Sequence, residues 1–522
     1  MKSTSTATFK FSAWDWLLAI VLGVASLALY IRTLAPGVLP GDSGEFQVLA
    51  YQFGIAHCPG YPIYLLLAKL FTFLPLGEIA YRVNLFSAFM AAVTISGVYL
   101  AARLLAVSRW AALFSSLILA VSYTLWSQAV IAEVYTTGAA FVVFILICVL
   151  GWQKTGKSSL LFIAGLLGGL ALGVHTTVAV LAPGIFVFLW LNRKSHSNFW
   201  WPAFGGALLG IFLWLMVFIW IDWYYPPANI FNGAYETARS AWDLSQEDIQ
   251  NPWVRIWFLA SAQQWRSALH FDLGRMLGEL VNYLQQLPRE LSVPGIFLSI
   301  VGWVSLARKR KDVAALLGIS LITHWLISFN YQIGDIYVFY ITGYLLLGLV
   351  AAVGLDVFSQ WVQKISPKWG PAVVAGASIL IILFSMKSLL MPRWASVQRG
   401  EVPFIGDENY LLWEDPADMA RVASHTVEQM KPNAIVFVDW SWLYIYYYVA
   451  HIEQGRMDLR FIEPSPRADK PGLPHSVLEF IEQNIDSRPI YFASPFAEVE
   501  AAGFDFQRAE IWYTTFYRVV RP

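Results

Sequence analysis

Eleven long apolar runs constrain the fold of this chain more than any other feature. Each run approaches or reaches the roughly 20 residues that an α-helix needs to cross a bilayer. Of the 522 residues, 57% are hydrophobic and only 13% are charged, which is too few charges for a soluble protein. We therefore expect a mainly α-helical, polytopic bundle of about eleven membrane spans. The runs lie at residues 16–29, 85–100, 110–125, 139–152, 160–174, 178–191, 202–221, 294–307, 313–329, 338–355 and 371–386.

Lysine and arginine residues predict how these spans are oriented, because loops retained in the cytoplasm carry the positive excess. Such residues precede the first run and then occur in every second connection. The pattern predicts a cytoplasmic N-terminus, with a first outer loop at 33–80 and a long outer loop at 222–292. It also requires the short apolar stretch 61–74 to be a surface or re-entrant helix. The residues are Lys2, Lys10, Arg103, Arg109, Lys154, Lys157, Arg193, Lys194, Arg308, Lys309, Arg310, Lys311, Lys364 and Lys368.

The tail differs in composition from the rest of the chain, because its apolar runs are short and charges return. Following a membrane domain at residues 1–391, we predict a small extracytoplasmic α/β domain at 392–522 with a partly parallel sheet. The expected helices lie at 416–430, 442–453 and 476–485, and the expected strands at 434–439, 459–463, 489–493 and 509–520.

Ionisable residues gather on the predicted outer face. Asp42, Glu45 and His57 lie in the first outer loop, and Glu133, His175 and Asp335 follow later spans. Ionisable groups beside hydrocarbon are costly, so their convergence on one face indicates a functional site. Each residue also has a simpler interpretation. Asp42 and Glu45 have the spacing of a capping box, and the two histidines fit a turn and a helix end.

Three cations lie on the same predicted face. Arg32, Lys69 and Arg82 suit an anionic headgroup through charge-assisted hydrogen bonds. The alternatives are that Lys69 extends toward the interface and that the arginines contact bilayer phosphates. A net charge of zero argues against a nucleic-acid partner, and two cysteines are too few for a disulfide framework.

Several segments resemble a known family of polytopic membrane proteins. They are DSGEFQVLAYQFGIAHCPGYPIYLLLAKLF, YRVNLFSAFMAA, AEVYTTGAAF, GLALGVHTTVAVLAPG and GDIYVFYITGYLLLGL. The family, formerly catalogued only as a membrane domain of unknown function, includes a eukaryotic transmembrane protein O-mannosyltransferase. Two positions depart from its pattern. Cys58 stands where proline is commoner, and Trp440-Ser441-Trp442 replaces the second acidic residue that usually follows Asp439.

The resemblance implies a C-type glycosyltransferase that takes a sugar, with mannose favoured, from a polyprenyl-phosphate donor. In this interpretation Asp42 is the catalytic base of an inverting displacement, and Glu45 orders the loop or contacts the sugar. A divalent cation bridging Asp42 or Glu45 with Glu133 is a further hypothesis, although no ligand spacing demands one, and no cofactor is certain. The expected pocket residues are His57, Tyr61, Glu133, Tyr135, His175 and Asp335, and those for the lipid phosphate are Arg32, Lys69 and Arg82.

The expected partners are the lipid-linked sugar, a protein or glycan acceptor, and the bilayer. The resemblance to bacterial family members favours a bacterial plasma (inner) membrane. The alternative function is a transporter or flippase of a lipid-linked or small polar substrate. Transporters, however, place their ionisable sites near the bilayer midplane and often consist of repeated halves, and neither feature is evident in the sequence.

Overall fold

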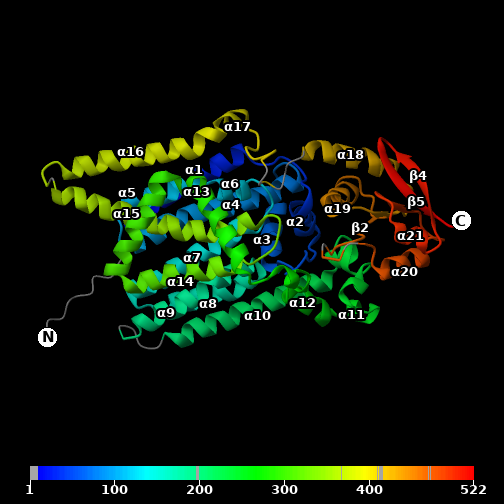
Figure 1. Cartoon of the computed structure of the whole chain (residues 1–522), viewed down its shortest axis with the longest axis horizontal. Helices are drawn as coiled ribbons and strands as arrows, with labels where there is room; N and C mark the ends of the chain where they lie inside the picture. The colour runs from blue at the N-terminus through cyan, green and yellow to red at the C-terminus, as the bar shows by residue number, and fades with distance from the viewer. Residues whose placement is uncertain are drawn as a thin grey trace.

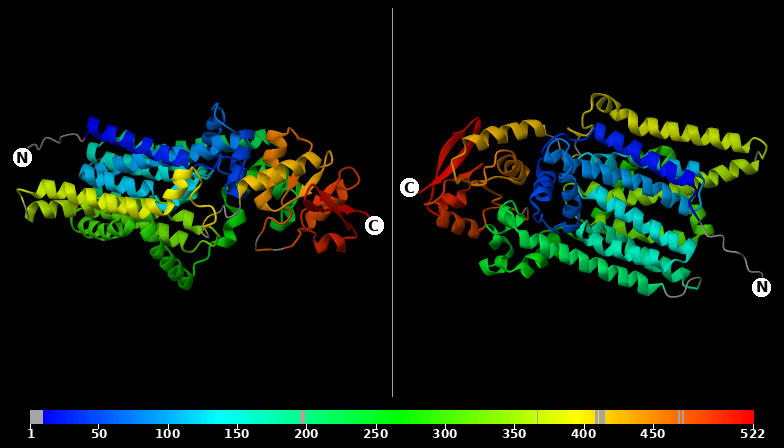
Figure 2. Two further views of the ribbon diagram at one scale, coloured as in Figure 1. Left: turned by 90° about the horizontal axis from the view of Figure 1, so that it is seen from above. Right: turned by 180° about the vertical axis from the view of Figure 1, so that it is seen from behind.

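The computed structural model describes residues 10–194, 199–365, 367–407, 410, 415–467, 469–470 and 472–522. Lys2 of the charge pattern lies outside these ranges. A bundle of long helices and a small α/β region lie at opposite ends of an elongated molecule, with α2 (Gly41–Gln52) and α3 (Pro62–Thr72) between them (Figure 1). The long helices run side by side along the long axis in all views (Figures 1 and 2). The predicted fold class, a membrane helix bundle with a small α/β region near the C-terminus, is confirmed.

All eleven predicted apolar runs lie in helices, but these helices differ in length. Within the described residues, eight helices are long and apolar enough to span a membrane, and a bent pair brings the number to nine. The pair is α5 (Arg109–Ala120) and α6 (Tyr123–Ala129), which meet at 61°. The two remaining runs form the shorter apolar helices Ser158–Gly173 and Thr176–Asn192. The long helices are α1 (Ala13–Arg32), α4 (Ile79–Leu104), α7 (Tyr135–Thr155), α10 (Trp200–Tyr224), α13 (Leu273–Lys309), α14 (Lys311–Ser328), α15 (Ile341–Ile365) and α16 (Gly370–Leu390).

Small residues let neighbouring helices approach closely, as is common where van der Waals packing rather than the hydrophobic effect joins membrane helices. α8 (Ser158–Leu170) and α10 pack in this way. A Cβ atom added at Gly206 would lie 2.0 Å from the carbonyl oxygen of Phe162, which excludes any larger side chain there.

α13 changes direction between Pro288 and Pro294. Ser292 has a φ of 63° inside the helix, which separates the first part of α13 from the part that carries the predicted span at 294–307. Arg289 and Glu290 lie directly before this break.

The tail contains a five-stranded sheet in the order β2-β1-β3-β5-β4. β1 (Ile435–Phe437) pairs in parallel with β2 (Arg460–Ile462) and β3 (Ile490–Phe492), which agrees with the partly parallel sheet expected from the alternation of helices and strands. β5 (Thr514–Val520) then pairs antiparallel with β3 and with β4 (Asp505–Ile511). The helices are α18 (Pro416–Gln429), α19 (Trp440–Tyr447), η8 (Tyr448–Glu453), α20 (His475–Asn484) and α21 (Ala497–Ala501).

The prediction of one strand at 509–520 was wrong, because the chain forms a hairpin there. β4 and β5 are joined by Trp512 and Tyr513, and Trp512 has a positive φ of 53°. Two-residue hairpin turns usually reveal themselves through glycine or asparagine, and this turn has neither. The sequence signal for the turn was therefore missing.

The segment between α10 and α13 folds into short helices that pack on the α/β region. Arg239 pairs with Glu479 of α20, and Ser240 and Ser476 exchange hydrogen bonds. The short helices are η3 (Phe231–Tyr235), η4 (Arg239–Trp242), α11 (Gln246–Gln250), α12 (Pro252–Ala260) and η5 (Gln263–Ala268).

The domain boundary after residue 391 stays a prediction. η7 (Met391–Arg393) and α17 (Trp394–Arg399) follow α16 directly, and Arg32 of α1 donates to the carbonyl oxygens of Val397 and Gln398. Bundle and tail are therefore tied together beyond that boundary.

Candidate active site

α2 lies between the helix bundle and α19 (Figure 1). The helix begins at Gly41, whose φ of +62° suits glycine. Gly44 faces α19, and a Cβ atom there would lie 2.3 Å from the carbonyl oxygen of Leu39 and 3.3 Å from Cβ of Tyr444. The absence of side chains at these positions allows the α/β region to close over the first turn of α2.

Asp42 and Glu45 do not form a capping box. The N-cap residue of α2 is Pro40, which offers no side-chain hydrogen bond, and Asp42 lies inside the first turn. Glu45 instead binds His57: Oε1 accepts the backbone N–H of His57 at 2.8 Å, and Oε2 lies 2.5 Å from Nδ1. The simpler interpretation of this acidic pair as a capping box is therefore wrong.

His57 stands between two carboxylates. Its Nε2 lies 3.6 Å from Oδ2 of Asp42, while its Nδ1 contacts Glu45. Burial alone lowers the pKa of this imidazole, but the charges of Glu45 and Asp42 outweigh burial and raise the pKa to about 9. At neutral pH His57 is therefore a cation that holds the two acidic side chains close together.

Asp42 is the accessible carboxylate of this group. Its side chain is 39% exposed, whereas those of His57 and Glu45 are 7% and 0% exposed. Trp440 Nε1 of α19 donates to Oδ1 of Asp42 at 2.7 Å. A hydrogen bond from Trp440 and an ion pair with His57 thus fix an acidic side chain that solvent or a substrate can reach.

Glu133 contacts α2 through Ser43, the residue after Asp42. Ser43 Oγ donates to its Oε1 at 3.2 Å, and Ser87 of α4 exchanges hydrogen bonds with its backbone. Burial, followed by the charges of Asp42 and Asp335, raises the pKa of Glu133 well above the ordinary value. The environment of Glu133 therefore favours its protonated form, which can donate as well as accept a hydrogen bond.

Aromatic rings continue the site from His57 toward the bundle. Tyr61 lies with its hydroxyl 3.5 Å from Nε2 of His57 and stacks on His175. Tyr135 and Phe339 pack on the same His175 ring, with centroids 5.1 Å and 4.9 Å away. Flat apolar faces beside polar groups suit a sugar ring.

His175 is neutral at physiological pH. Burial, with a smaller contribution from the charge of His57, lowers its pKa to about 3. Its Nδ1 accepts the backbone N–H of Thr177 at 3.3 Å and lies 2.6 Å from the Thr177 hydroxyl, an arrangement that suits the tautomer with the proton on Nε2.

Asp335 joins the site through charge rather than a direct contact. It precedes η6 (Ile336–Tyr340), the short helix that carries Phe339. Burial and the charge of Asp42 raise the pKa of Asp335 to about 6. The structure thus brings together all the acidic, histidine and tyrosine side chains expected in the pocket. We call Asp42, Glu45, His57, Glu133 and Asp335 the acidic cluster.

The α/β region contributes two residues that sequence reasoning did not assign to the site. Trp440 fixes Asp42, and Glu463, which follows β2, lies within reach of the charges of Asp439, Glu45 and Asp42. Burial and those charges raise the pKa of Glu463 to about 8. Trp440 was visible only as a departure from the family pattern. Asp439 caps α19 by accepting the N–H of Ser441.

The three predicted phosphate-binding cations have other partners. Arg32 donates to α17, Lys69 donates to the carbonyl of Tyr51, and Arg82 donates to three carbonyls between Thr72 and Gly77. Among the described residues, none of these three side chains makes a hydrogen bond or an ion pair with the acidic cluster. Their hydrogen bonds tie together the segments next to the site.

The described part of the chain contains no group of three histidine, cysteine, aspartate or glutamate side chains arranged to hold one metal ion. The acidic side chains are held by His57, Ser43 and Trp440 instead. The suggested bridging cation therefore stays an untested prediction.

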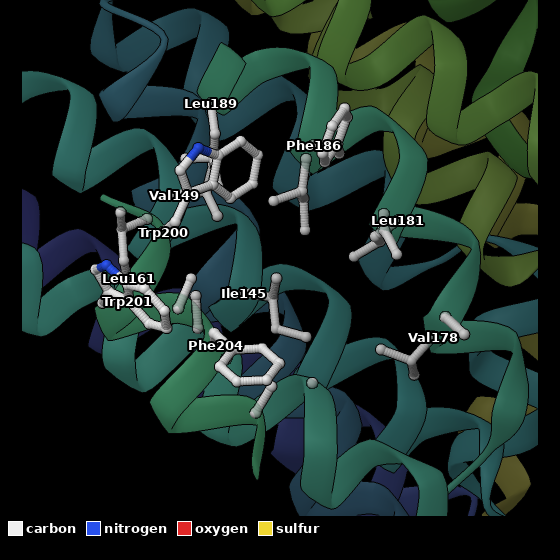
Figure 3. Close-up of a pocket in the computed structure, with 18 residues that line it drawn as sticks. Ile145, Val149, Leu161, Val178, Leu181, Phe186, Leu189, Trp200, Trp201 and Phe204 are labelled. Carbon is white, nitrogen blue, oxygen red and sulfur yellow. The ribbon is translucent and has the colours of Figure 1, made fainter. Parts of the chain in front are cut away.

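An apolar cavity of about 600 Å³ lies next to the aromatic rings, between α7, α8, η2 (Thr176–Leu181), α9 (Ala182–Asn192) and α10 (Figure 3). Val178, which follows His175 by three residues, lines the cavity. A Cβ atom built at Gly138 would lie within 4 Å of both side chains, so the cavity and His175 are neighbours. Phe186, Trp201 and Phe204 line it and are largely exposed on the bundle surface. We call this cavity the apolar groove.

Comparison with known proteins adds to this geometry. Residues 42–198 match the family described as the protein O-mannosyl-transferase TMEM260 N-terminal domain. The matched segment carries the first outer loop from Asp42 onward, together with Glu133 and His175. The chain resembles this family.

Curated relatives show the same resemblance over part of their length. Protein O-mannosyl-transferase TMEM260 of Mus musculus is 37% identical over 120 residues, or 23% of this chain and 17% of the mouse protein. The protein of the same name from Dictyostelium discoideum is 28% identical over 130 residues, or 24% of this chain and 16% of that protein. The matches thus span about one sixth of each relative.

Solved structures show the fold. ArnT from Cupriavidus metallidurans in the apo state superposes with a TM-score of 0.57 at 13% identity, covering 97% of this chain and 98% of ArnT. The Archaeoglobus fulgidus oligosaccharyltransferase in the apo form superposes with a TM-score of 0.55 at 12% identity, covering 92% of this chain and 69% of that enzyme. The C-type glycosyltransferase architecture expected from the sequence is therefore confirmed.

Proposed function

We propose that this protein is a membrane glycosyltransferase that moves a sugar, with mannose favoured, from a polyprenyl-phosphate donor to a protein or glycan acceptor. One observation carries the proposal: an accessible carboxylate, Asp42, is fixed by His57 and Trp440 beside a wall of aromatic rings. Relatives named protein O-mannosyl-transferase support the reaction class, and the fold neighbours support the architecture.

In the proposed mechanism Asp42 is the general base. It takes the proton of the acceptor hydroxyl as the oxygen attacks the anomeric carbon, and the bond from that carbon to the donor phosphate breaks with inversion. Protonated His57 and the indole N–H of Trp440 hold the carboxylate in place without consuming its remaining lone pairs. Glu45 is buried and orders the loop by holding His57.

The remaining pocket residues would contact the sugar. Glu133 and His175 offer polar groups to sugar oxygens, and Tyr61 and Tyr135 offer ring faces. Asp335, with its pKa raised to about 6, is ionised at neutral pH and suits a sugar hydroxyl as an acceptor.

The apolar groove supports a lipid-linked donor. Its lining is almost entirely hydrocarbon, its volume is in the range of ligand pockets, and it begins next to His175 in the site. An isoprenoid chain lying there would leave its sugar at the acidic cluster. A soluble nucleotide-sugar donor would have no use for such a surface.

We further propose that the acidic cluster and the α/β region face away from the cytoplasm, as the pattern of lysine and arginine predicts. The proposed bacterial plasma membrane rests on the sequence resemblance alone, since the curated relatives come from a mouse and an amoeba.

Transfer by the reconstituted protein tests the proposal. Liposomes containing wild type, Asp42→Asn or Asp418→Asn would receive radiolabelled polyprenyl-phosphate mannose and either a serine- and threonine-rich peptide or an acceptor extract. Asp418 is a matched control, because it also lies in the first turn of a helix but is exposed and paired with Arg421.

We expect labelled acceptor with wild type and Asp418→Asn, and loss of transfer with Asp42→Asn. Transfer that is equal in all three proteins would reject Asp42 as the base. Label that crosses the membrane without any covalent product would favour the transporter alternative instead.

A further inference from the structure

Two arginine side chains meet on one aromatic ring close to the acidic cluster. The guanidinium carbon of Arg289, from α13, lies 4.0 Å from the ring centroid of Tyr123, and that of Arg393, from η7, lies 4.8 Å from the same centroid. The charges of Glu290 and Asp407 act on Arg393, which offsets the repulsion between the two guanidinium groups. We call Arg289 and Arg393 the arginine pair.

Arg289 has hydrogen-bond donors that are not used within the protein. Its Nε and Nη2 are buried without a hydrogen-bond partner, while its side chain as a whole is 28% exposed. The neighbouring carboxylate of Glu290 lies 3.8 Å from Nε, beyond hydrogen-bond distance, and accepts two hydrogen bonds from Thr124. Buried donors without a partner are costly, and a planar pair of them matches a phosphate oxygen pair.

η6 links the arginine pair to the acidic cluster. Phe339 of this helix packs on His175, while the hydroxyl of Tyr337, two residues earlier, is buried without a partner. The charges of Asp335, Glu133 and Arg289 all act on that hydroxyl. The Tyr337 hydroxyl is therefore an unused hydrogen-bonding group on the helix that also contacts His175.

We propose that Arg289 and Arg393, together with the Tyr337 hydroxyl, bind the phosphate anion of the lipid-linked donor. This inference rests on the proposed function for the identity of the anion. A phosphate would be repelled by the acidic cluster, whereas the arginine pair lies over Tyr123 of α6, the helix that packs on η6. Arg32, Lys69 and Arg82 donate to backbone carbonyls, and Arg393 donates to the carbonyl oxygen of Leu389 through Nη1. The unpartnered Nε and Nη2 of Arg289 distinguish the arginine pair, so the phosphate-binding role predicted for the other three moves to it.

Binding of undecaprenyl phosphate to the full chain in nanodiscs tests this assignment. The proteins are wild type, Arg289→Gln, Arg393→Gln and, as a matched control, Arg399→Gln, which removes an exposed arginine paired with Glu401. We expect at least tenfold weaker binding for each variant of the arginine pair and no change for Arg399→Gln. Undecaprenol, which lacks the phosphate, should bind weakly and equally to all four.

Arg289→Lys is a control for the possibility that the Gln variants bind weakly because they misfold. It keeps the charge over Tyr123 but loses the planar pair of donors, so we expect folded protein with binding between that of wild type and Arg289→Gln. Wild-type affinity in both Gln variants would overturn the proposal.

Competition separates the sources of the phosphate. Phosphatidylglycerol or inorganic phosphate that binds the arginine pair as tightly as undecaprenyl phosphate would also overturn the donor assignment, because the site would then hold a bilayer headgroup or free phosphate. We expect neither to displace the probe at equal concentration.

Sugar transfer by the same proteins distinguishes the two proposals. Arginine-dependent binding of undecaprenyl phosphate without transfer by wild type would reject the proposed function and support the phosphate site. Transfer with an unchanged KM for the donor in Arg289→Gln and Arg393→Gln would support the proposed function and reject the phosphate site.

Discussion

The acidic cluster and the apolar groove lie next to each other at His175, yet they differ in nearly every physical property. In the cluster the carboxylates of Asp42, Glu45 and Glu133 each accept a hydrogen bond from a named donor, and Asp335 joins them through charge. The groove is lined by aliphatic and aromatic side chains, some of them open to the surface of the bundle. The difference teaches that, in the proposed function, catalysis and lipid binding are divided between two neighbouring regions. The cluster suits the transfer reaction, and the groove suits the apolar isoprenoid chain of a donor.

Changes in the cluster should therefore alter the rate of the chemical step, and changes in the groove should alter the affinity for the donor. The predictions below test that division, beginning with the largest expected effect.

Asp42→Asn should lower kcat for sugar transfer by roughly 10²- to 10⁴-fold, the usual contribution of a general base. The amide keeps the hydrogen bond from Trp440 but cannot take a proton. Steady-state transfer assays at several donor concentrations would measure kcat and KM separately. A rise in KM with an unchanged kcat would contradict the division, because Asp42 would then act in binding alone.

Glu45→Gln should lower stability and change its dependence on pH. The pKa of His57 is raised from 6.5 to about 9 in the folded protein, so its contribution to stability is complete below pH 6.5 and is lost as the pH rises through 9. The Tm of wild type in detergent should fall across that interval.

In Glu45→Gln the largest favourable charge beside His57 is removed. The Tm should therefore be lower at pH 6.5 and should fall less between pH 6.5 and 9. Thermal unfolding followed by intrinsic fluorescence at both pH values would measure this. Parallel curves for wild type and variant would mean that His57 is not charged by Glu45.

Trp440→Phe should lower kcat about tenfold, which corresponds to about 1.4 kcal/mol for a charge-assisted hydrogen bond. Trp442→Phe is the matched control, since Trp442 lies on the same helix and packs on Tyr446. Equal activities of these two variants would show that the contact of Trp440 with Asp42 has no part in the reaction.

Gly168→Leu should raise the KM for a long-chain donor about tenfold and leave kcat unchanged. Gly168 lines the groove, and a Cβ atom there meets no other atom within 4 Å, so a larger side chain has room to start into the groove. Gly205→Leu is the control, because its Cβ position is equally open and it does not line the groove.

A donor with a short isoprenoid chain sharpens this last test. Its KM should be nearly the same in wild type and Gly168→Leu, because a short chain does not fill the groove. An equal rise in KM for both donors would indicate a change in the site itself rather than lost room for the lipid.

The sequence revealed the site residues whose polarity differs from that of their hydrophobic neighbours. Asp42, Glu45 and His57 stand out in a hydrophobic chain, because an ionisable group beside hydrocarbon is energetically costly and is usually retained for a function. The groove gave no such signal, since its lining residues look like any other membrane helix. The hairpin of β4 and β5 also escaped, because Trp512 and Tyr513 are not typical turn residues.

The sequence by itself determined that the chain enters a membrane, that helices dominate, that the tail alternates helices and strands, and that the acidic residues of the first loop are unusual. Hydrophobic length and periodicity are local properties, so they can be read along the chain. Only the tertiary structure decided that Trp440 reaches Asp42 across 398 positions, that Arg32 and Arg82 donate to backbone carbonyls, and that Arg289 and Arg393 share one ring. Such pairings depend on which helices become neighbours, and that choice is made by the packing of the whole bundle rather than by any one segment.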